Sequence, residues 1–408
     1  MPRNSARGSR PRSRPAPAER PSPPEVDLYA TTAPGLEDLL REEVESAGLA
    51  RQVGLVKGRV TFSAVGAPPL PLPLLACDRA GLVVRTAHGD FTGLRGLTEL
   101  RGKLARTEFD RALAALAALG VEKPRTFKVV AEVAPACDFM FFDVKREGTP
   151  IIASRLGLEL SEEQPDVLVD VQVLPDAAHV GLELPLVSWA AAAKPARVPR
   201  SLVGAVIRLA GPAPRLTACD PDCGAGELLG AWRAVAGPGR VIGLGARPPA
   251  RPQPTRRVPG VAVAIPRVWP IADARLSRVF SLNPRLRTPV DFAKLADETA
   301  RCLAPGGRAV FLVPGDQDLL RALEAQPSLT VERTILLRDR EESRRLVVLR
   351  REGKAPGHHT PTTAGDRARA TRELGGVVSR RQRSWRPPSK SEPSRGGRPS
   401  PKRKSRKP

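Results

Sequence analysis

The residues best suited to chemistry form a glycine-rich string, Asp220-Pro221-Asp222-Cys223-Gly224-Ala225-Gly226, between a short apolar run and a helix-forming segment. A glycine-rich turn between a strand and a helix lets the backbone approach a ligand closely, and the first N–H groups of the helix can bind an anion. A Gly-x-Gly pair alone is also compatible with a tight turn in any α/β protein. Cys219 and Cys223 lie close together, but no further Cys or His pair stands near them to complete a zinc site.

Strands and helices alternate around this string from about residue 199 onward. The periodicity predicts helices at 199–210, from 227, at 290–303 and at 316–326, and strands at 216–219, 241–244, 261–265, 279–282 and 308–313. Two final strands, 328–337 and 344–350, are joined by a short connection and predict an antiparallel hairpin. A parallel sheet that ends in such a hairpin is the outline of a class I methyltransferase domain, a Rossmann relative.

The region 26–184 has a different pattern and predicts an α+β fold. We expect strands at 26–31, 55–62 and 127–133, an edge strand at 166–173 with a hairpin partner at 179–184, and helical segments at 36–47, 98–119 and 138–156. No catalytic constellation stands out in this region. His88 and His179 are isolated and are interpreted as ordinary surface or core histidines.

Basic residues gather at the two ends of the chain, whose net charge is +23. Residues 1–25 and 354–408 are rich in Pro, Arg and Ser and are predicted to be disordered. The second segment holds sixteen basic residues against three acids, which favours a polyanionic partner such as nucleic acid. The alternative explanation of these basic segments is a compositional bias toward Arg, Ala, Pro and Gly across the whole sequence.

Several classes of protein are excluded on composition. No apolar stretch approaches the ~18 residues of a membrane span, and the N-terminus lacks the apolar core of a secretory signal. Five cysteines are an odd number and predict no disulfide framework, so the expected compartment is the reducing cytoplasm. A nucleotide-dependent dehydrogenase is excluded because Gly-x-Gly-x-x-Gly is absent and no acid ends the second strand.

The full string from Asp220 to Leu229 resembles motif I of S-adenosylmethionine-dependent, RNA-modifying methyltransferases. The segment from Tyr29 to Leu39, with Thr31-Thr32, Pro34-Gly35-Leu36 and Leu39, is similar to the N-terminal signature of THUMP-domain RNA methyltransferases. Thr126-Phe127-Lys128-Val129, the strand after Pro165 and the segment Val180-Gly181-Leu182-Glu183-Leu184 resemble their THUMP module, and Leu303 to Arg308 resembles the turn before their fifth strand. The resemblance covers about 26–350.

This resemblance implies four parts. They are a disordered basic segment (1–25), a ferredoxin-like and THUMP region that captures RNA (26–184), a Rossmann-like class I methyltransferase domain (185–353) and a disordered basic segment (354–408). The implied substrate is the exocyclic amine of guanine in ribosomal or transfer RNA, and the implied donor is S-adenosylmethionine. Neither a membrane nor a metal is implied.

The resemblance also implies site residues. Asp220, Cys223, Gly224 and Gly226 would contact the donor, and Asp273 would contact its adenine amine, although an ordinary loop aspartate is an equal alternative. Asn283 and the carbonyl of Pro284 would accept the hydrogens of the target amine. Together these residues form the predicted site.

The sequence departs from the family pattern at several of these places. The family string Asn-Pro-Pro-Tyr or Asn-Pro-Pro-Phe reads Asn283-Pro284-Arg285-Leu286, so the aromatic ring that stacks the flipped base is missing. Gly245 stands where an acid normally binds the ribose, and five prolines in 246–259 exclude the usual crossover helix. Two hypotheses therefore remain: an RNA guanine methyltransferase with an unusual target pocket, and an RNA-binding protein that kept the fold and lost the chemistry.

Overall fold

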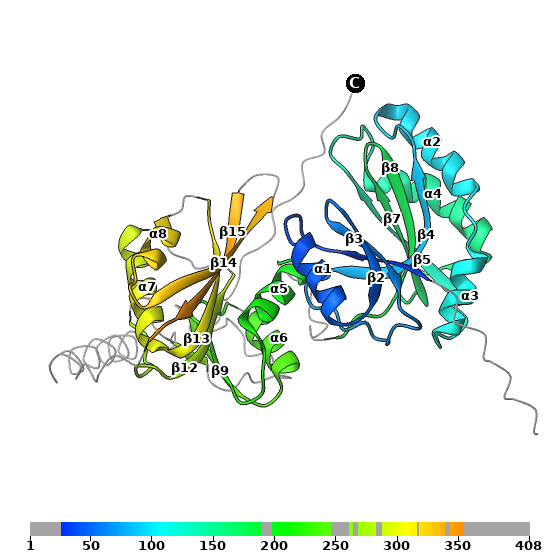
Figure 1. Ribbon diagram of the computed structural model, residues 1–408. Helices are drawn as coiled ribbons and strands as arrows, with labels where there is room; N and C mark the ends of the chain where they lie inside the picture. The colour runs from blue at the N-terminus through cyan, green and yellow to red at the C-terminus, as the bar shows by residue number, and fades with distance from the viewer. Residues whose placement is uncertain are drawn as a thin grey trace, which may run out of the picture. The chain divides into compact units, whose positions relative to one another are not determined.

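The computed structural model describes residues 26–188, 198–224, 226–245, 261–263, 268–282, 288–315, 318–338 and 343–353 (Figure 1). All of these described residues belong to one compact unit. The predicted basic segments 1–25 and 354–408 and the proline-rich segment 246–259 lie outside the described residues. Within the described ranges, no helix is long and apolar enough to cross a membrane.

The N-terminal half is built on one mixed sheet with the strand order β2-β3-β1-β4-β8-β7-β5-β6. Its strands are β1 (Asp27–Thr31), β2 (Ala50–Val56), β3 (Arg59–Ala64), β4 (Arg79–His88), β5 (Thr126–Val133), β6 (Glu159–Leu160), β7 (Val167–Val173) and β8 (Ala177–Glu183). Its helices are α1 (Glu37–Ser46), α2 (Gly93–Ala105), α3 (Asp110–Ala118) and α4 (Phe141–Leu156). Alternate strand residues such as Leu28, Ala30, Val169 and Val171 form one core with the helices. The predicted α+β class is confirmed.

Three predictions for this half were wrong in detail. The strand expected at 55–62 is a hairpin of β2 and β3, because Gly58 takes a positive φ of 72° and reverses the chain. The helix expected at 98–119 is two helices, α2 and α3, separated by the buried Thr107 and Phe109. The strand expected at the edge, β7, lies between β8 and β5, while β4 was not predicted at all.

The C-terminal half contains a seven-stranded sheet with the order β11-β10-β9-β12-β13-β15-β14. The strands are β9 (Thr217–Asp220), β10 (Arg240–Gly245), β11 (Val261–Val263), β12 (Leu276–Ser281), β13 (Leu303–Val313), β14 (Leu329–Arg338) and β15 (Ser343–Arg351). The first five are parallel, whereas β15 is antiparallel to both β13 and β14. The predicted parallel sheet with a terminal hairpin is confirmed.

Helices cover both faces of this second sheet (Figure 1). One core joins α5 (Arg200–Ala210) and α6 (Glu227–Ala236) to strand residues such as Ala218 and Val310. The other core joins α7 (Pro289–Cys302) and α8 (Asp318–Glu324) to Cys219 and Phe311. These two residues directly follow Ala218 and Val310 in the same strands. Because consecutive residues of a strand point to opposite faces, burial on both sides requires continuously apolar strands. The sheet, packed on both faces, therefore holds the loops that follow its strands in fixed positions.

Candidate functional site

The glycine-rich turn follows β9, at the point where the strand order reverses direction. The chain runs outward from β9 to β10 and β11 on one side, and continues on the other side with β12 and β13. In open α/β sheets, ligands bind outside the carboxyl ends of the strands at such a reversal. The fold therefore places the turn in the position that a ligand site of this architecture uses.

Hydrogen bonds within the chain fix the shape of this turn. The N–H of Asp222 donates to Oδ1 of Asp220 over 3.0 Å, and the N–H of Gly226 donates to the carbonyl of Cys223 over 2.6 Å. Gly224 and Gly226 have positive φ values of 50° and 86°, which other residues rarely adopt. These glycines are thus required by the backbone path that leads into α6.

The turn is packed tightly on its inner side and open on its outer side. The N–H of Cys223 donates to the carbonyl of Leu244 in β10 over 2.9 Å. A Cβ atom added to Gly243 would lie only 2.8 Å from the Cys223 sulfur and from a methyl group of Leu229. A Cβ added to the exposed Gly224, by contrast, would meet no atom of the described residues within 4 Å. Among these residues, the Gly224 backbone is therefore open to the approach of a ligand.

Asp220 lies beneath this open turn and is only 3% exposed. Burial raises the pKa of its carboxyl group to about 8, and the nearby negative charge of Asp222 acts in the same direction. The hydrogen bond from Asp222 opposes the shift, and no cationic side chain of the described residues contributes to it. A buried acid without a positive partner suits a cationic ligand group, which would favour the ionised carboxylate.

The cysteine of the turn has a structural role. Burial raises the pKa of the Cys223 thiol to about 11, so this thiol is neutral at physiological pH. All five cysteines are free and buried. Among the residues that the structure describes, no group of three or more His, Cys, Asp or Glu side chains is placed to hold a metal ion.

The end of β10 is at the same edge of the sheet as Asp220. Gly243 is the register partner of Asp220, and Gly245 lies two residues farther along, paired with Val263 of β11. An acidic residue at position 245 would therefore reach the rim of the turn. Glycine offers no carboxylate there.

The predicted catalytic residues Asn283 and Pro284 lie outside the described residues, together with Arg285 and Leu286. The preceding strand β12 is described, and its Val279 is the register partner of Cys219 in β9. Ser281, the last residue of β12, is fully buried, and its hydroxyl has no hydrogen-bond partner among the described atoms. The chain therefore leaves β12 beside β9, but the roles of Asn283 and Pro284 stay predictions.

The structure does not bring Asp273 together with the turn. Asp273 lies three residues before the start of β12, at the amino end of the parallel strands, whereas the turn lies at their carboxyl end. A strand of six residues separates these edges by roughly 20 Å. The carboxylate of Asp273 accepts a hydrogen bond from Nη1 of Arg301 over 2.6 Å. Of the five predicted donor-binding residues, only Asp220, Cys223, Gly224 and Gly226 lie together.

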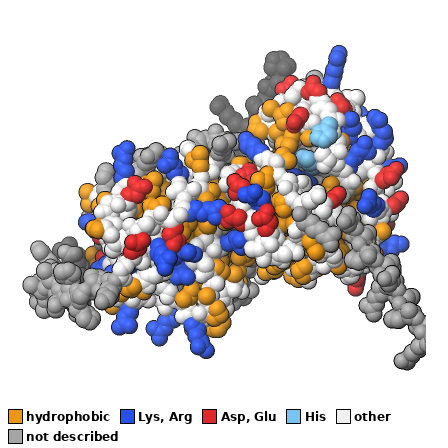
Figure 2. All heavy atoms as spheres, viewed as in Figure 1, with side chains coloured by type: hydrophobic (Ala, Val, Ile, Leu, Met, Phe, Trp, Pro, Cys, Tyr) orange, Lys and Arg blue, Asp and Glu red, His pale blue; other side chains and the backbone are white. Residues whose placement is uncertain are grey.

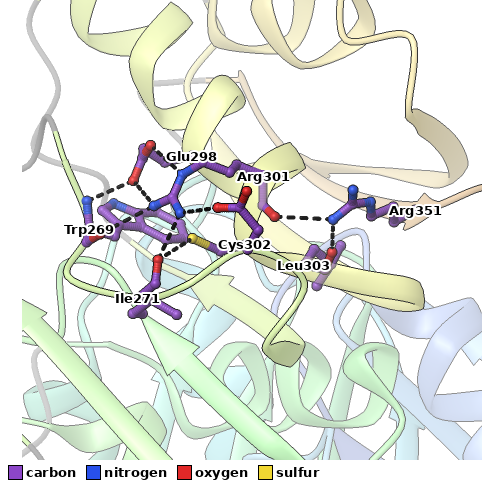
Figure 3. A network of polar contacts seen from close by, with 8 residues as sticks. Trp269, Ile271, Glu298, Arg301, Cys302, Leu303 and Arg351 are labelled. Atoms are coloured by element: carbon purple, nitrogen blue, oxygen red, sulfur yellow. Dashed lines mark hydrogen bonds and ion pairs between the residues drawn. The ribbon is translucent and has the colours of Figure 1, made fainter. Parts of the chain in front are cut away.

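Arg301 is the centre of a polar network that the sequence interpretation missed (Figure 3). Its guanidinium donates to both carboxylate oxygens of Glu298, over 2.9 and 2.7 Å, and to the carbonyls of Trp269 and Ile271. Glu298 also accepts the N–H of Trp269 over 2.7 Å. These bonds hold the loop before β12 against α7. The three-residue spacing of Glu298 and Arg301, which makes them neighbours on the surface of a helix, was the sequence signal that could have predicted their pairing.

Comparisons with known proteins agree with this architecture. A family model described as the RlmL ferredoxin-like domain matches residues 27–66. A curated relative, the tRNA (guanine(6)-N2)-methyltransferase of Thermus thermophilus, is 29% identical over an alignment of 223 residues that covers 52% of this chain and 62% of that protein. The chain thus matches less than two thirds of this relative's length.

Solved structures share the fold over most of the chain. TrmN from Thermus thermophilus has a TM-score of 0.56 and 21% identity, covering 80% of this chain and 99% of its own. A possible methylase from Clostridium difficile 630 has a TM-score of 0.54 and 11% identity, covering 82% of this chain and 100% of its own. The putative methyltransferase SMU.472, solved with SAH, has a TM-score of 0.52 and 14% identity, covering 82% of this chain and 99% of its own. The chain therefore shares the fold of these methyltransferases and begins with a segment that matches a ferredoxin-like domain, as the resemblance implied.

Proposed function

We propose that the protein is an S-adenosylmethionine-dependent methyltransferase that modifies the exocyclic amine of guanine in transfer or ribosomal RNA. The observation that carries this proposal is the open turn of Gly224 and Gly226 above the buried carboxyl group of Asp220, at the strand reversal of a methyltransferase-like sheet. The names of the relatives support the same reaction class. The five free cysteines suit the reducing cytoplasm in which we place the reaction.

The residues of the turn fit the donor chemically. S-adenosylmethionine supplies an electrophilic methyl group on a sulfonium centre and also carries an ammonium group. The Asp220 carboxylate would pair with positive charge, and the backbone at Gly224 would lie against the ligand because no side chain intervenes. We do not assign Asp273 to the donor site, because its carboxylate is held by Arg301 at the opposite edge of the sheet.

The target amine requires acceptors beside the turn. The Asn283 side chain and the Pro284 carbonyl would accept its two hydrogens and aim the nitrogen lone pair at the methyl carbon. Positioning of this kind carries most of the catalysis expected for a direct transfer, since no covalent enzyme intermediate is needed. Leu286 cannot supply the π-face that stacks a base in relatives, so base positioning is expected to be weaker than in the family.

Calorimetric titration with S-adenosylmethionine and S-adenosylhomocysteine tests the donor site. The wild-type protein should bind both, and Asp220→Asn should weaken S-adenosylmethionine because a charge-assisted contact is lost, by about 1.5–3 kcal/mol. Gly230→Ala is a matched control in the same domain, because a Cβ at this exposed position of α6 meets no atom of the described part of the chain within 4 Å. If neither ligand binds to the folded wild-type protein, the proposed donor site is wrong.

A further inference from the structure

Charged side chains are buried on one face of the sheet in the N-terminal half. Helices α2 and α4 cover the other face (Figure 1), where alternate strand residues such as Leu28 and Ala30 join their core. Charged side chains of both signs are scattered over the surface in Figure 2, where water solvates them. The side chains of Arg59 and Asp170, by contrast, are 0% exposed. Burial of charge is costly unless the charge is paired, so the partners of these two residues decide how this face behaves.

The single tyrosine of the chain lies at the base of this buried face. A Cβ added to Gly81 or Gly181 would lie 2.8 or 2.2 Å from a ring carbon of Tyr29, so the ring packs against the backbone of β4 and β8. The guanidinium carbon of Arg59 lies 3.9 Å from the centroid of the same ring, a cation–π contact. The tyrosine ring therefore lies between these strands and the arginine.

The sheet is strongly curled around this face. Arg59 of β3 lies in the row of Arg79 on β4, whereas Asp170 of β7 lies in the row of Val83, four residues farther along β4. The strands β3 and β7 are four strand spacings apart. In a flat sheet, with ~4.8 Å between strands and ~3.3 Å per residue, their two Cα atoms would be about 23 Å apart. Yet Nη1 of Arg59 lies 3.7 Å from Oδ2 of Asp170 and 3.3 Å from Oε1 of Gln172, which requires the sheet to bend over its own polar face.

Arg79 adds a second acid to this contact. Its guanidinium lies 3.0 Å from Asp170, 3.8 Å from Glu183 and 3.3 Å from the exposed Glu132. Two buried guanidinium groups thus face two buried carboxyl groups from four different strands. We call this group the Arg79 cluster, and its members are Arg59, Arg79, Asp170 and Glu183.

The charges of the Arg79 cluster are incompletely hydrogen-bonded. Among the described atoms, Oε1 of Glu183 and the Nε and Nη2 atoms of Arg59 are buried without a hydrogen-bond partner. A buried carboxylate that lacks hydrogen bonds is disfavoured relative to its neutral form, because nothing replaces the water that it loses. Asp170 is held between two arginines, whereas Glu183 contacts only one. Glu183 is therefore the member of the cluster at which a bound proton stabilises the curled sheet.

The groups around Glu183 leave it as the one that changes charge near neutral pH. Burial raises the pKa of Glu183 to about 7, while the positive charge of Arg79 opposes this shift and the negative charge of Asp170 adds to it. Burial lowers the pKa of His179, on the same strand, to about 4, so this imidazole is neutral above pH 5. The other titratable or charged groups of this face come from five strands: Tyr29 of β1, Arg59 of β3, Arg79 of β4, Glu132 of β5 and Asp170 of β7.

We propose that the Arg79 cluster is a proton-dependent switch in the curl of the sheet, which stays closed while Glu183 is protonated and opens more readily when Glu183 ionises. Ionisation adds a poorly hydrogen-bonded negative charge to a buried site, and opening of the curl lets water solvate that charge. The closed form therefore holds the proton. This contribution to stability is complete below about pH 4.5 and is lost as pH rises through about 7. The inference goes beyond the proposed methyl transfer and does not depend on it.

Nuclear magnetic resonance of Tyr29 in the full-length protein reports on the cluster directly. The chain contains one tyrosine, so tyrosine labelled with carbon-13 at Cζ gives one signal, from a ring beside the cluster. This signal should shift with a midpoint near pH 7, and the shift is not ionisation of the phenol itself, because burial raises the pKa of Tyr29 well above its ordinary value. Glu183→Gln should abolish the shift. Glu132→Gln, which changes the exposed acid beside Arg79, is the matched control and should retain it.

Hydrogen exchange of the β7 and β8 amides measures the opening of the curl, after correction for the intrinsic exchange rate at each pH. With a pKa of about 7 for Glu183 in the closed form and about 4.5 when it is exposed, the closing equilibrium should weaken about 70-fold between pH 5 and pH 8. Glu183→Gln should remove this change. Glu132→Gln should keep it, and so should Asp220→Asn, whose carboxyl group lies in the other half.

Arg59→Met tests whether the buried charges hold the curl. The substitution removes the link between β3 and β7 and leaves Asp170 with one arginine, so exchange in β3 should become faster by 10-fold or more at every pH. Arg101→Met breaks an exposed pair with Glu147, at 3.6 Å, and is the matched control that should change little. If Arg59→Met does not fold, the Tyr29 signal of the wild type and of Glu183→Gln still decides the inference.

Four results would overturn the inference. They are a Tyr29 signal that does not change between pH 5 and pH 9, a shift that persists in Glu183→Gln, a closing equilibrium in β7 and β8 that does not depend on pH, and a folded Arg59→Met variant that exchanges like the wild type. None of these measurements involves the donor or RNA. The proposed function is therefore tested separately.

Discussion

Replacing Gly243 by alanine tests how the glycine-rich turn is held in place. The new methyl group would lie 2.8 Å from both the Cys223 sulfur and a Leu229 methyl group, where ordinary contacts are 3.4–4 Å. Cys223 precedes Gly224 and Leu229 follows Gly226, so their displacement shifts both ends of the turn. Overpacking of this kind costs about 1–3 kcal/mol. We expect Gly243→Ala to lower the free energy of unfolding by that amount and to weaken donor binding.

Gly230→Ala supplies the control for this substitution. Gly230 is in the middle of α6, and its added methyl group meets no atom of the residues that the structure describes within 4 Å. This variant should be more stable by about 0.5–1 kcal/mol, because alanine is the better helix former, and should bind the donor normally. Urea unfolding and calorimetric titration measure both quantities. Equal stability and equal donor affinity of Gly243→Ala and the wild type would refute the described packing of β10 beneath the turn.

Five further predictions concern the donor site, the loop before β12 and the charged tail. The pKa of Asp220 is about 8 in the folded protein and about 3.9 in the unfolded chain, so between these values the native state binds one more proton than the unfolded state. The free energy of unfolding should therefore fall as pH rises from about 4 to about 8. Asp220→Asn should remove this part of the pH dependence in urea unfolding. Donor affinity should rise over the upper part of the same range in pH-dependent calorimetry, since the ionised carboxylate pairs with positive charge. Asp273→Asn should leave donor affinity unchanged in calorimetry, because Arg301 rather than the ligand occupies this carboxylate. Gly245→Asp should tighten donor binding by about 1.5–3 kcal/mol, and an unchanged affinity would count against an acid at the end of β10. Truncation after residue 353 should leave the melting temperature unchanged, weaken RNA binding at low salt and make the slope of log affinity against log salt shallower. Equal slopes for the truncated and full-length proteins would show that residues 354–408 do not bind RNA.

The methyltransferase-like half was predictable because its strands are buried on both faces. Continuous apolar runs such as Ala309 to Val313 are bounded by glycine and proline, so most strands were placed to within a few residues. The exception is β13, which begins at Leu303 rather than at the predicted residue 308. The turn at 220–226 was predictable for a different reason, since its backbone requires glycine at fixed positions.

The N-terminal half was harder because its strands carry buried charge. Asp170 of β7 suggested an exposed edge, yet it is fully buried and pairs with Arg79 of β4 over 3.0 Å. Residues so distant in sequence leave no periodic signal, and the same holds for the pairing of Asp273 with Arg301. The alternation of polar and apolar residues in a strand shows only the chemical type of each side chain. Whether a polar side chain is buried depends on its tertiary contacts.

Mass spectrometry of RNA nucleosides tests the central claim most directly. The wild-type protein is incubated with S-adenosylmethionine and bulk transfer or ribosomal RNA, beside Asn283→Ala and a variant that combines Arg285→Pro with Leu286→Tyr. The account predicts guanosine methylated at its exocyclic amine with the wild type, none with Asn283→Ala despite nearly intact donor affinity, and more with the double variant. Methylation by the double variant but none by the wild type, whatever RNA is offered, would contradict the account and leave an RNA-binding protein that has lost its chemistry.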